Sequence, residues 1–247
     1  GMKAEGQENI INLLRCAWAG SQKYGALVWS GDIKSSFPSM KNQVAAGLNM
    51  GIAGIPWWTT DIGGFFGANI NDPEFHELLV RWFEYGCFCP VMRLHGYRWP
   101  LQPQYGTTGG ATCVSGAPNE VWSYTDQVCE ILSDYLRLRE RMLPYITELM
   151  AEAHEKGTPV MRPLFYDFPE DKESWNVETE YMFGPKVLVK PITDADARET
   201  DVYLPGGASW TNAWTGETFE GGQKVHVAAP IEQIPLFTRD GYKLPMK

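Results

Sequence analysis

The chain has 247 residues, which is enough for a full hydrophobic core and for one or two domains. Its net charge of −9 and the lack of a Lys- or Arg-rich run argue against a nucleic-acid-binding protein, and no apolar stretch is long enough to span a membrane. Five cysteines without a CxxC pair predict reduced, mostly buried thiols, which are compatible with a reducing compartment and leave cytoplasm and periplasm open.

The first two-thirds of the chain alternate short apolar runs with amphipathic segments. We expect strands at 10–14, 25–29, 51–58 and 89–94, and helices at 39–48 and from Pro73 onward, the latter capped by Asp72. Strands that alternate with helices indicate βα units and a parallel sheet. The strands are apolar throughout, which suits a sheet that is covered on both faces.

A loop and a long helical region come next, and the composition of the chain changes after Thr158-Pro159. Residues 97–119 read as a loop, and 126–155 as a long helical region that Pro144 interrupts and Gly157 ends. Short strands are then predicted at 187–189, 201–204 and 224–227, separated by glycine-rich turns. We therefore expect an α/β domain over 1–160 and a small all-β sandwich over 161–247.

Charged side chains follow the predicted strands of the first domain. Arg15 follows the first strand, Asp32 the second, Asp61 the third, and Arg93 and His95 the fourth. Because the carboxyl ends of parallel strands meet at one edge, we expect these side chains to converge. Paired carboxylates suit glycoside cleavage, whereas two alone supply too few oxygens for a hard metal ion.

Aromatic residues flank the two aspartates, and flat apolar rings are surfaces on which sugars lie. Trp29 and Phe65 are nearest to the strand ends, and Gly63-Gly64 reads as a tight turn. Each residue taken singly also has a structural explanation, since an Asp can cap a helix and a His or Trp can pack in a core. The sequence has no GxGxxG after a strand, no Walker loop, no GxSxG and no HExxH, so we expect neither a cofactor nor a catalytic metal.

Several long segments resemble one known family. They are LLRCAWAGSQKYGALVWSGD, GLNMGIAGIPWWTTDIGGF, RWFEYGCFCPVMRLHG, RMLPYI, MRPLF and YMFGPKVLVKPI. In sequence, order and spacing these segments are similar to glycoside hydrolase family 31, the α-glucosidases and α-xylosidases, and the resemblance covers essentially the whole chain.

The resemblance implies a fold and a set of roles. The fold is the C-terminal half of a (β/α)8 TIM barrel, about four βα units corresponding to strands five to eight, followed by a β-sandwich. The chemistry is retaining cleavage of α-linked sugars, with Asp32 as general acid/base. The substrate-contacting positions that the resemblance implies are Arg15, Trp29, Asp61, Phe65, Arg93 and His95.

The chain also departs from the family pattern. The nucleophile of this family is an aspartate after barrel strand four, and this chain begins just before strand five. We therefore expect little hydrolysis by the chain alone, and self-association or a partner chain that covers the open barrel edges. The alternative is a non-catalytic carbohydrate-binding relic or scaffold. The sequence does not choose between glucose and xylose.

Overall fold

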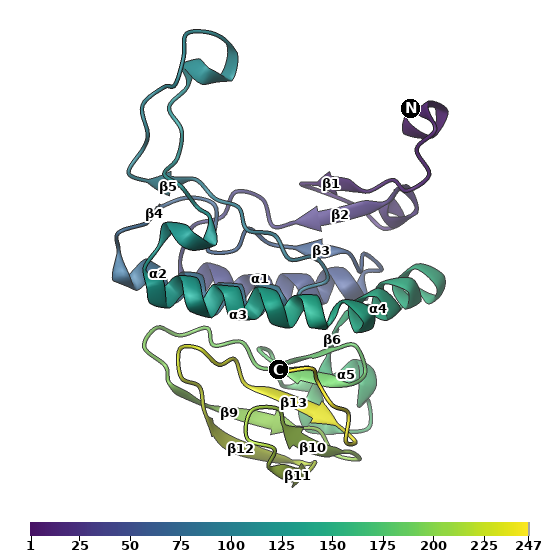
Figure 1. Cartoon of the computed structure of the whole chain (residues 1–247). Helices are drawn as coiled ribbons and strands as arrows, with labels where there is room; N and C mark the ends of the chain where they lie inside the picture. Colours follow the sequence, from purple (N-terminus) through teal and green to yellow (C-terminus); the bar gives the residue numbers. More distant parts are fainter. Residues whose placement is uncertain (247) are drawn as a thin grey trace.

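Three short strands near the start of the chain form a parallel sheet (Figure 1), in a computed structural model that describes residues 1–246. They are β1 (Asn12–Leu14), β2 (Ala26–Trp29) and β3 (Trp58–Thr59), and β2 lies between the other two. This parallel pairing confirms the predicted βα arrangement. The apolar start of β2 is buried, as a sheet covered on both faces requires.

The helix after β2 is longer than predicted, which shortens the next strand. Helix α1 spans Phe37–Ile52, because the Ser36 side chain accepts a hydrogen bond from the Ser39 amide and so caps the helix earlier. Its buried face includes Met40 and Val44. Since α1 continues through residue 52, the strand predicted over 51–58 is wrong, and only Trp58–Thr59 form β3.

The strand predicted over 89–94 is also wrong in extent. Leu94 forms a single parallel bridge with Ile62, and the Val91 amide donates to the Trp58 carbonyl oxygen at 3.1 Å. Pro90 has no amide hydrogen, so it cannot extend this ladder. The segment nevertheless lies beside β3 in parallel orientation, which brings the residues that follow it to the same edge of the sheet.

Two further helical regions cover the sheet. Asp72 caps helix α2 (Pro73–Cys87) as predicted, accepting from the Glu74 amide at 3.0 Å. The long helical region divides into α3 (Asp126–Arg141) and α4 (Leu143–Lys156), as Pro144 predicts, and Gly157 ends it with a φ of 71°. No helix among residues 1–246 is both long and apolar enough to cross a membrane.

The C-terminal region consists of two sheets and confirms the predicted switch to β structure (Figure 1). The predicted strand 187–189 is β8, while 201–204 and 224–227 lie within β9 and β12. The larger sheet contains β11 (Thr218–Glu220), β10 (Ser209–Asn212), β13 (Leu236–Arg239), β8 (Val187–Val189), β7 (Tyr181–Phe183) and β6 (Met161–Pro163), in that order. The smaller sheet pairs β12 (Gln223–Ala228) with β9 (Glu199–Leu204).

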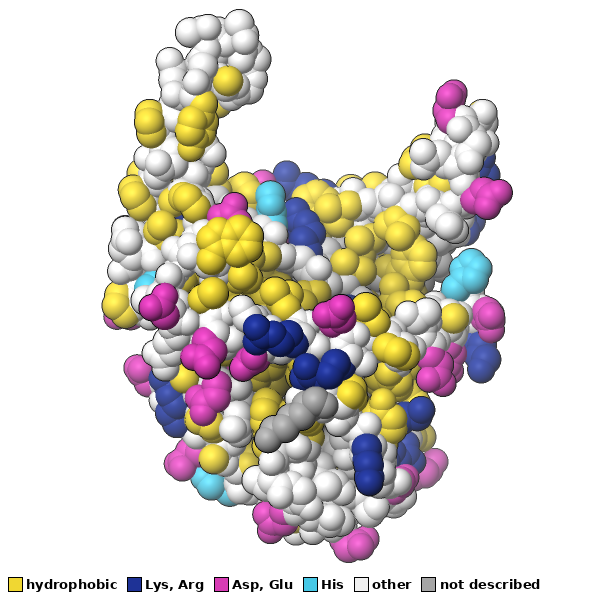
Figure 2. All heavy atoms as spheres, viewed as in Figure 1, with side chains coloured by type: hydrophobic (Ala, Val, Ile, Leu, Met, Phe, Trp, Pro, Cys, Tyr) yellow, Lys and Arg dark blue, Asp and Glu magenta, His cyan; other side chains and the backbone are white. Residues whose placement is uncertain are grey.

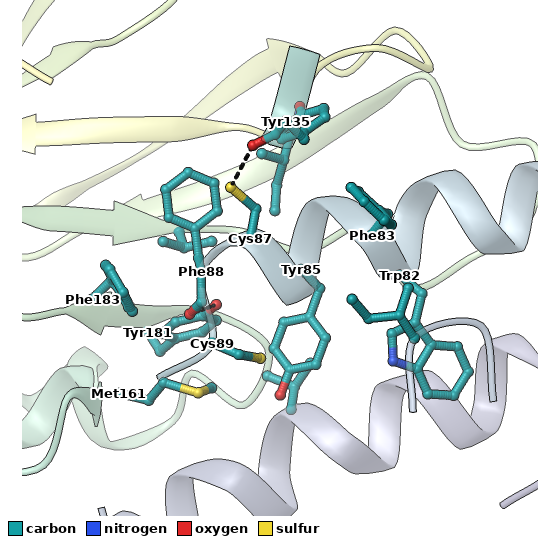
Figure 3. Close-up of a cluster of buried hydrophobic side chains, with 14 of the residues drawn as sticks. Trp82, Phe83, Tyr85, Cys87, Phe88, Cys89, Tyr135, Met161, Tyr181 and Phe183 are labelled. Atoms are coloured by element: carbon teal, nitrogen blue, oxygen red, sulfur yellow. Dashed lines mark hydrogen bonds between the residues drawn. The ribbon is translucent and has the colours of Figure 1, made fainter. Parts of the chain in front are cut away.

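The larger C-terminal sheet contributes side chains to two hydrophobic cores, one on each of its faces. Tyr181 and Phe183 of β7 join the main core, next to Cys87 and Phe88 at the end of α2 (Figure 3). Met182, between them, packs instead in a second core that lies between the two C-terminal sheets. The side chains of successive strand residues point to opposite faces, so one sheet packs on the helices with one face and on β9 and β12 with the other.

The cysteines are less buried than expected. All five are unpaired: Cys87 and Cys89 are buried, Cys129 is half-buried, and Cys16 and Cys113 are exposed. The prediction that most of these thiols are buried is wrong, and their reduced state stays a prediction. Burial raises the pKa of Cys87 and of Cys89 to about 12, because a thiolate loses its hydration there, so these two are apolar packing groups.

Candidate active site

Asp32 and Arg15 lie at the open edge of the sheet. Asp32 follows β2 by three residues, after Gly31 turns the chain with a φ of +76°. Arg15 directly follows β1, and its Nη2 lies 3.3 Å from Asp32 Oδ2. The Arg15 and Asp32 side chains are 63% and 42% exposed, so the Asp32 carboxylate faces solvent. We call the carboxyl ends of β1, β2 and β3, with the parallel segment 91–95 beside β3, the rim.

Asp61 is the buried acid of the rim. It lies two residues after β3, its side chain is fully buried, and its Oδ1 pairs with the Arg93 guanidinium. Its Oδ2 is also buried and accepts no hydrogen bond from the described residues. An acceptor of this kind costs free energy unless a donor reaches it.

The electrostatics of Asp61 show which groups surround it. Burial is the largest effect and raises the pKa of Asp61, the neighbouring Arg93 and His95 side chains lower it, and the Asp32 carboxylate raises it. These groups come from the ends of β2, of β3 and of the segment that continues beside it. They therefore converge on one rim, as predicted from the sequence.

Aromatic rings line the same rim. The Arg93 guanidinium carbon lies 5.9 Å from the centre of the Trp29 ring. The rings of Phe65 and His95 are 5.6 Å apart and tilted by 31°, and Phe65 also stacks on Tyr97 at 6.4 Å. The seven predicted residues thus form three contact groups: Arg15 with Asp32, Arg93 with Asp61 and Trp29, and Phe65 with His95. Asp61 lies near enough to Asp32 and His95 for both to affect its pKa. What this set binds stays a prediction.

A buried arginine that sequence reasoning missed supports the rim. Arg98 donates to the Ile62 carbonyl oxygen at 3.0 Å, to the Gly64 carbonyl oxygen at 2.8 Å and to Asn119 Oδ1 at 3.0 Å. Its burial lowers its pKa, and these acceptors compensate part of the lost hydration. In the sequence Arg98 stands in a segment that we predict to be a loop. The one signal that could have identified it is its position three residues after His95.

Arg15 and Asp32 are open to solvent, and two sizeable cavities among residues 1–246 lie away from the seven residues. A cavity of about 650 Å³ lies between α3 and the loop around Trp214, and one of about 740 Å³ lies beside residues 105–123; neither is lined by any of the seven residues. Within residues 1–246, no group of three or more His, Cys, Asp and Glu side chains could hold a metal ion.

Comparisons with known proteins match both regions of the chain. The model of the glycosyl hydrolases family 31 TIM-barrel domain matches residues 1–149. The model of the glycosyl hydrolase family 31 C-terminal domain matches residues 157–244. The predicted fold, part of a TIM barrel followed by a β domain, is thereby confirmed, whereas the boundary near residue 160 stays a prediction.

Individual relatives agree with these matches. The alpha-xylosidase of Saccharolobus solfataricus is 39% identical over 98% of this chain and 31% of its own length. The crystal structure of a GH31 alpha-xylosidase from a soil metagenome, complexed with xylose, has 54% identity and a TM-score of 0.94 over 98% of this chain and 36% of that one. A Flavobacterium johnsoniae GH31 dextranase complexed with glucose has 32% identity and a TM-score of 0.84 over 98% and 28%.

The chain therefore spans about a third of the length of these relatives. The family matches together cover nearly all of it, and they follow the order of the barrel region and the β region seen in the fold. On these grounds the chain belongs to glycoside hydrolase family 31.

Proposed function

We propose that this chain supplies the acid/base and much of the sugar-holding rim of a retaining α-glycoside hydrolase that acts on α-linked xylose or glucose. The observation that carries the proposal is the convergence of Asp32, Asp61, Arg93 and His95 at the ends of neighbouring parallel strands. Relatives named alpha-xylosidase, and a relative structure that contains xylose, support this substrate class.

The two aspartates suit different roles. Asp32 is open to solvent, so its carboxyl group can exchange a proton with a leaving oxygen and then with water. Asp61 is buried and paired with Arg93, which leaves Oδ2 to accept a sugar hydroxyl but keeps the carboxylate away from an attacking position. Arg15, His95, Trp29 and Phe65 complete the walls around the sugar.

Retaining cleavage needs a second free carboxylate about 5–5.5 Å from the acid/base. Among the seven rim residues, Asp32 is the one carboxylate that is exposed, since Asp61 is buried in its ion pair. We therefore propose that the nucleophile comes from polypeptide outside these 247 residues or from a partner chain, and we expect little or no hydrolysis by the chain alone.

Hydrolysis of aryl α-xylosides and aryl α-glucosides by the purified chain tests this assignment. We expect no turnover above background, and saturable binding of xylose or glucose that weakens in Asp61→Asn. Asp194→Asn, an exposed aspartate of the C-terminal region, is the matched control and is expected to bind normally. Turnover that disappears in Asp32→Asn would show that the chain is a complete catalyst and overturn the proposed division of labour.

The non-catalytic alternative predicts a different pattern. A carbohydrate-binding protein without catalytic function would bind the sugar, but it would stay inactive when a chain that bears the missing barrel strands is added. We expect instead that such a chain restores turnover to wild type and not to Asp32→Asn. Restored activity in both would remove Asp32 from the acid/base role.

The exposed edge of the sheet supports self-association or a partner chain. Within residues 1–246, β1 pairs on one side only, and Ile11 and Leu13 beside this edge are 60% and 41% exposed. Unpaired edges with apolar neighbours bind other chains. Light scattering is expected to give a mass above the monomer, and Ile11→Lys is expected to lower it. A monomeric wild type in isolation, with no binding to the missing strands, would contradict the proposal.

A further inference from the structure

An uncharged arm rises beside the rim. Residues 99–116, here called the arm, follow β5 (Arg98–Trp99) and extend on the side of the β1–β3 sheet that faces away from the C-terminal sheets (Figure 1). Residues 99–119 contain no Asp, Glu, Lys, Arg or His. Figure 2 shows the arm without dark blue or magenta side chains, although the protein carries 21 basic and 30 acidic residues.

A cavity of about 740 Å³ lies between the arm and the short 3-10 helix Val121–Ser123. Two aromatic rings line it, Tyr105 from the arm and Trp122 from this helix, and they are 75% and 72% exposed. The volume falls in the range of about 300–1,000 Å³ that is usual for small-molecule sites. Large exposed rings in a concave site are unusual unless something packs on them.

Polar groups line the same cavity. The cavity is also lined by Ser115, Asn119, Glu120 and Ser123. A hydrogen bond from the Ser123 hydroxyl at 2.9 Å lowers the pKa of Glu120, so its exposed carboxylate is an acceptor at neutral pH. A cavity lined by two aromatic rings and by hydroxyl, amide and carboxylate groups suits a sugar, which has apolar C–H faces and hydroxyl edges.

One side chain connects this cavity to the rim. Arg98 donates from Nε to Asn119 Oδ1 at 3.0 Å and from Nη2 to the Ile62 carbonyl oxygen at 3.0 Å. The amide of Ala117, which also lines the cavity, donates to the Arg98 carbonyl oxygen at 2.9 Å. The floor of the cavity and the loop that begins at Asp61 therefore lie on two sides of the same arginine.

We propose that the cavity between Tyr105 and Trp122 is a second saccharide site, which binds a sugar unit remote from the bond that is cleaved in an α-linked oligosaccharide. This inference rests on the proposed function. It adds that a substrate long enough to reach both the rim and the cavity binds more tightly than a single sugar. The arm itself carries no charge, and Glu120 is the one charged side chain among the residues that line the cavity, where its carboxylate can accept a hydrogen bond from a sugar hydroxyl. In this site the Tyr105 and Trp122 rings pack on the apolar faces of the sugar. Asn119 and Glu120 form hydrogen bonds with the hydroxyls of the sugar.

Titrations with maltotetraose and with xylose, followed by calorimetry or ligand-observed NMR, test this site. Trp122→Ala is expected to raise the Kd for maltotetraose by roughly 2- to 12-fold, the cost of one aromatic contact, and to leave the Kd for xylose unchanged. Trp122→Phe should restore most of the affinity. Trp175→Ala, which removes a tryptophan that is 58% exposed in the C-terminal region, is the control and should change neither Kd.

The outcomes separate the two proposals. A wild-type chain that binds neither sugar contradicts the proposed function itself. Binding of xylose together with an unchanged maltotetraose Kd in both Trp122→Ala and Tyr105→Ala overturns the second site alone. If these variants lower the mass measured by light scattering but keep both affinities, the arm is a protein contact and the saccharide assignment is wrong.

Discussion

The ion pair between Asp61 and Arg93 is the best-defined residue-scale feature of the rim. Asp61 is fully buried, whereas the Arg93 side chain is 24% exposed and also faces the Trp29 ring. Removing one member of a buried pair leaves an uncompensated charge, which costs more than the pair itself contributes. The pair therefore fixes the position of Asp61, and under the proposed function a change in it would alter both stability and sugar binding.

Arg93→Met tests this coupling. We expect the free energy of unfolding to fall by about 3 kcal/mol, because Asp61 is then buried without its cation. The pKa of Asp61, already raised by burial, should rise further, since the charge of Arg93 is one of the effects that lower it. Urea denaturation and NMR titration measure the two effects.

The double variant Arg93→Met with Asp61→Asn serves as the control. It should be more stable than Arg93→Met alone, because no buried charge is left without a partner. Arg93→Met with wild-type stability, or a double variant that is less stable still, would show that the two side chains are not coupled.

At the scale of elements, the loop at 61–65 holds the buried acid and Phe65 in position. The Gly64 amide donates to the Asp61 carbonyl oxygen at 2.8 Å, and Gly63 and Gly64 have φ values of +85° and +74°. This is the tight turn that the sequence predicts. A Cβ atom on Gly64 would lie 2.6 Å from Ser35 Cα, so the loop is packed directly on the chain that follows Asp32.

Gly64→Ala is expected to destabilise the protein by more than about 1 kcal/mol and to weaken sugar binding, because both the positive φ and the contact with Ser35 oppose a side chain. Gly67→Ala is the matched control. Its φ is also positive, +87°, but a Cβ there meets only Lys34 Cγ at 3.8 Å, so backbone strain acts without a clash. Equal effects of both variants on sugar binding would contradict this account of the loop.

The elements also show where sequence reasoning stops. Caps and breaks are local, so Asp72, Pro144 and Gly157 predicted the ends of three helices correctly. Strand extent is not local, because a strand lasts only as long as a neighbour supplies hydrogen bonds. The segment 89–94 has the composition of a strand but pairs at only a few points, which its own residues could not reveal.

The convergence of the strand ends was predictable for a related reason, whereas the roles of these residues stay predictions. Asp32, Asp61 and His95 were identified because parallel strands bring their carboxyl ends together, which needs only the order of strands and not their exact lengths. Arg98 was not identified, since its role depends on the carbonyl oxygens of the loop that it holds. Such contacts exist only once the loop has folded.

At the scale of the whole molecule, a buried network joins the barrel region to the C-terminal region. Arg81 of α2 pairs with Glu84 at 3.1 Å and donates to carbonyl oxygens of the C-terminal loops, including Ala229 at 2.6 Å. Tyr135 of α3 donates to Glu84 at 3.1 Å and to the Glu232 carbonyl oxygen at 3.1 Å. This network fixes the C-terminal region against helices α2 and α3.

The network gives the protein a pH dependence. Complete burial raises the pKa of Glu84 from 4.5 to about 8, an effect that the Arg81 charge and hydrogen bond and the Tyr135 hydrogen bond only partly offset. The folded state therefore holds this proton more tightly than the unfolded state does. The contribution of Glu84 to stability falls as the pH rises from about 4.5 to about 8, and it is constant outside that window.

Glu84→Gln should remove that slope. We expect urea midpoints of the wild type to fall between about pH 5 and about pH 8, and those of Glu84→Gln to change less over the same interval. Glu140→Gln, on the exposed side of α3, is the control and should keep the wild-type dependence. A Glu84→Gln variant with the full wild-type slope would mean that the network does not titrate in this range.

The central claim is that seven residues from neighbouring strand ends form one sugar-binding rim, and a titration of the chain with xylose tests it most directly. Ligand-observed NMR should detect saturable binding to the wild type and a Kd roughly 10- to 100-fold higher for Asp61→Asn, because a hydroxyl loses a charged acceptor. Folding of both proteins is checked by circular dichroism. Equal xylose affinity in the folded wild type and the folded variant, or no binding to either, would contradict the account.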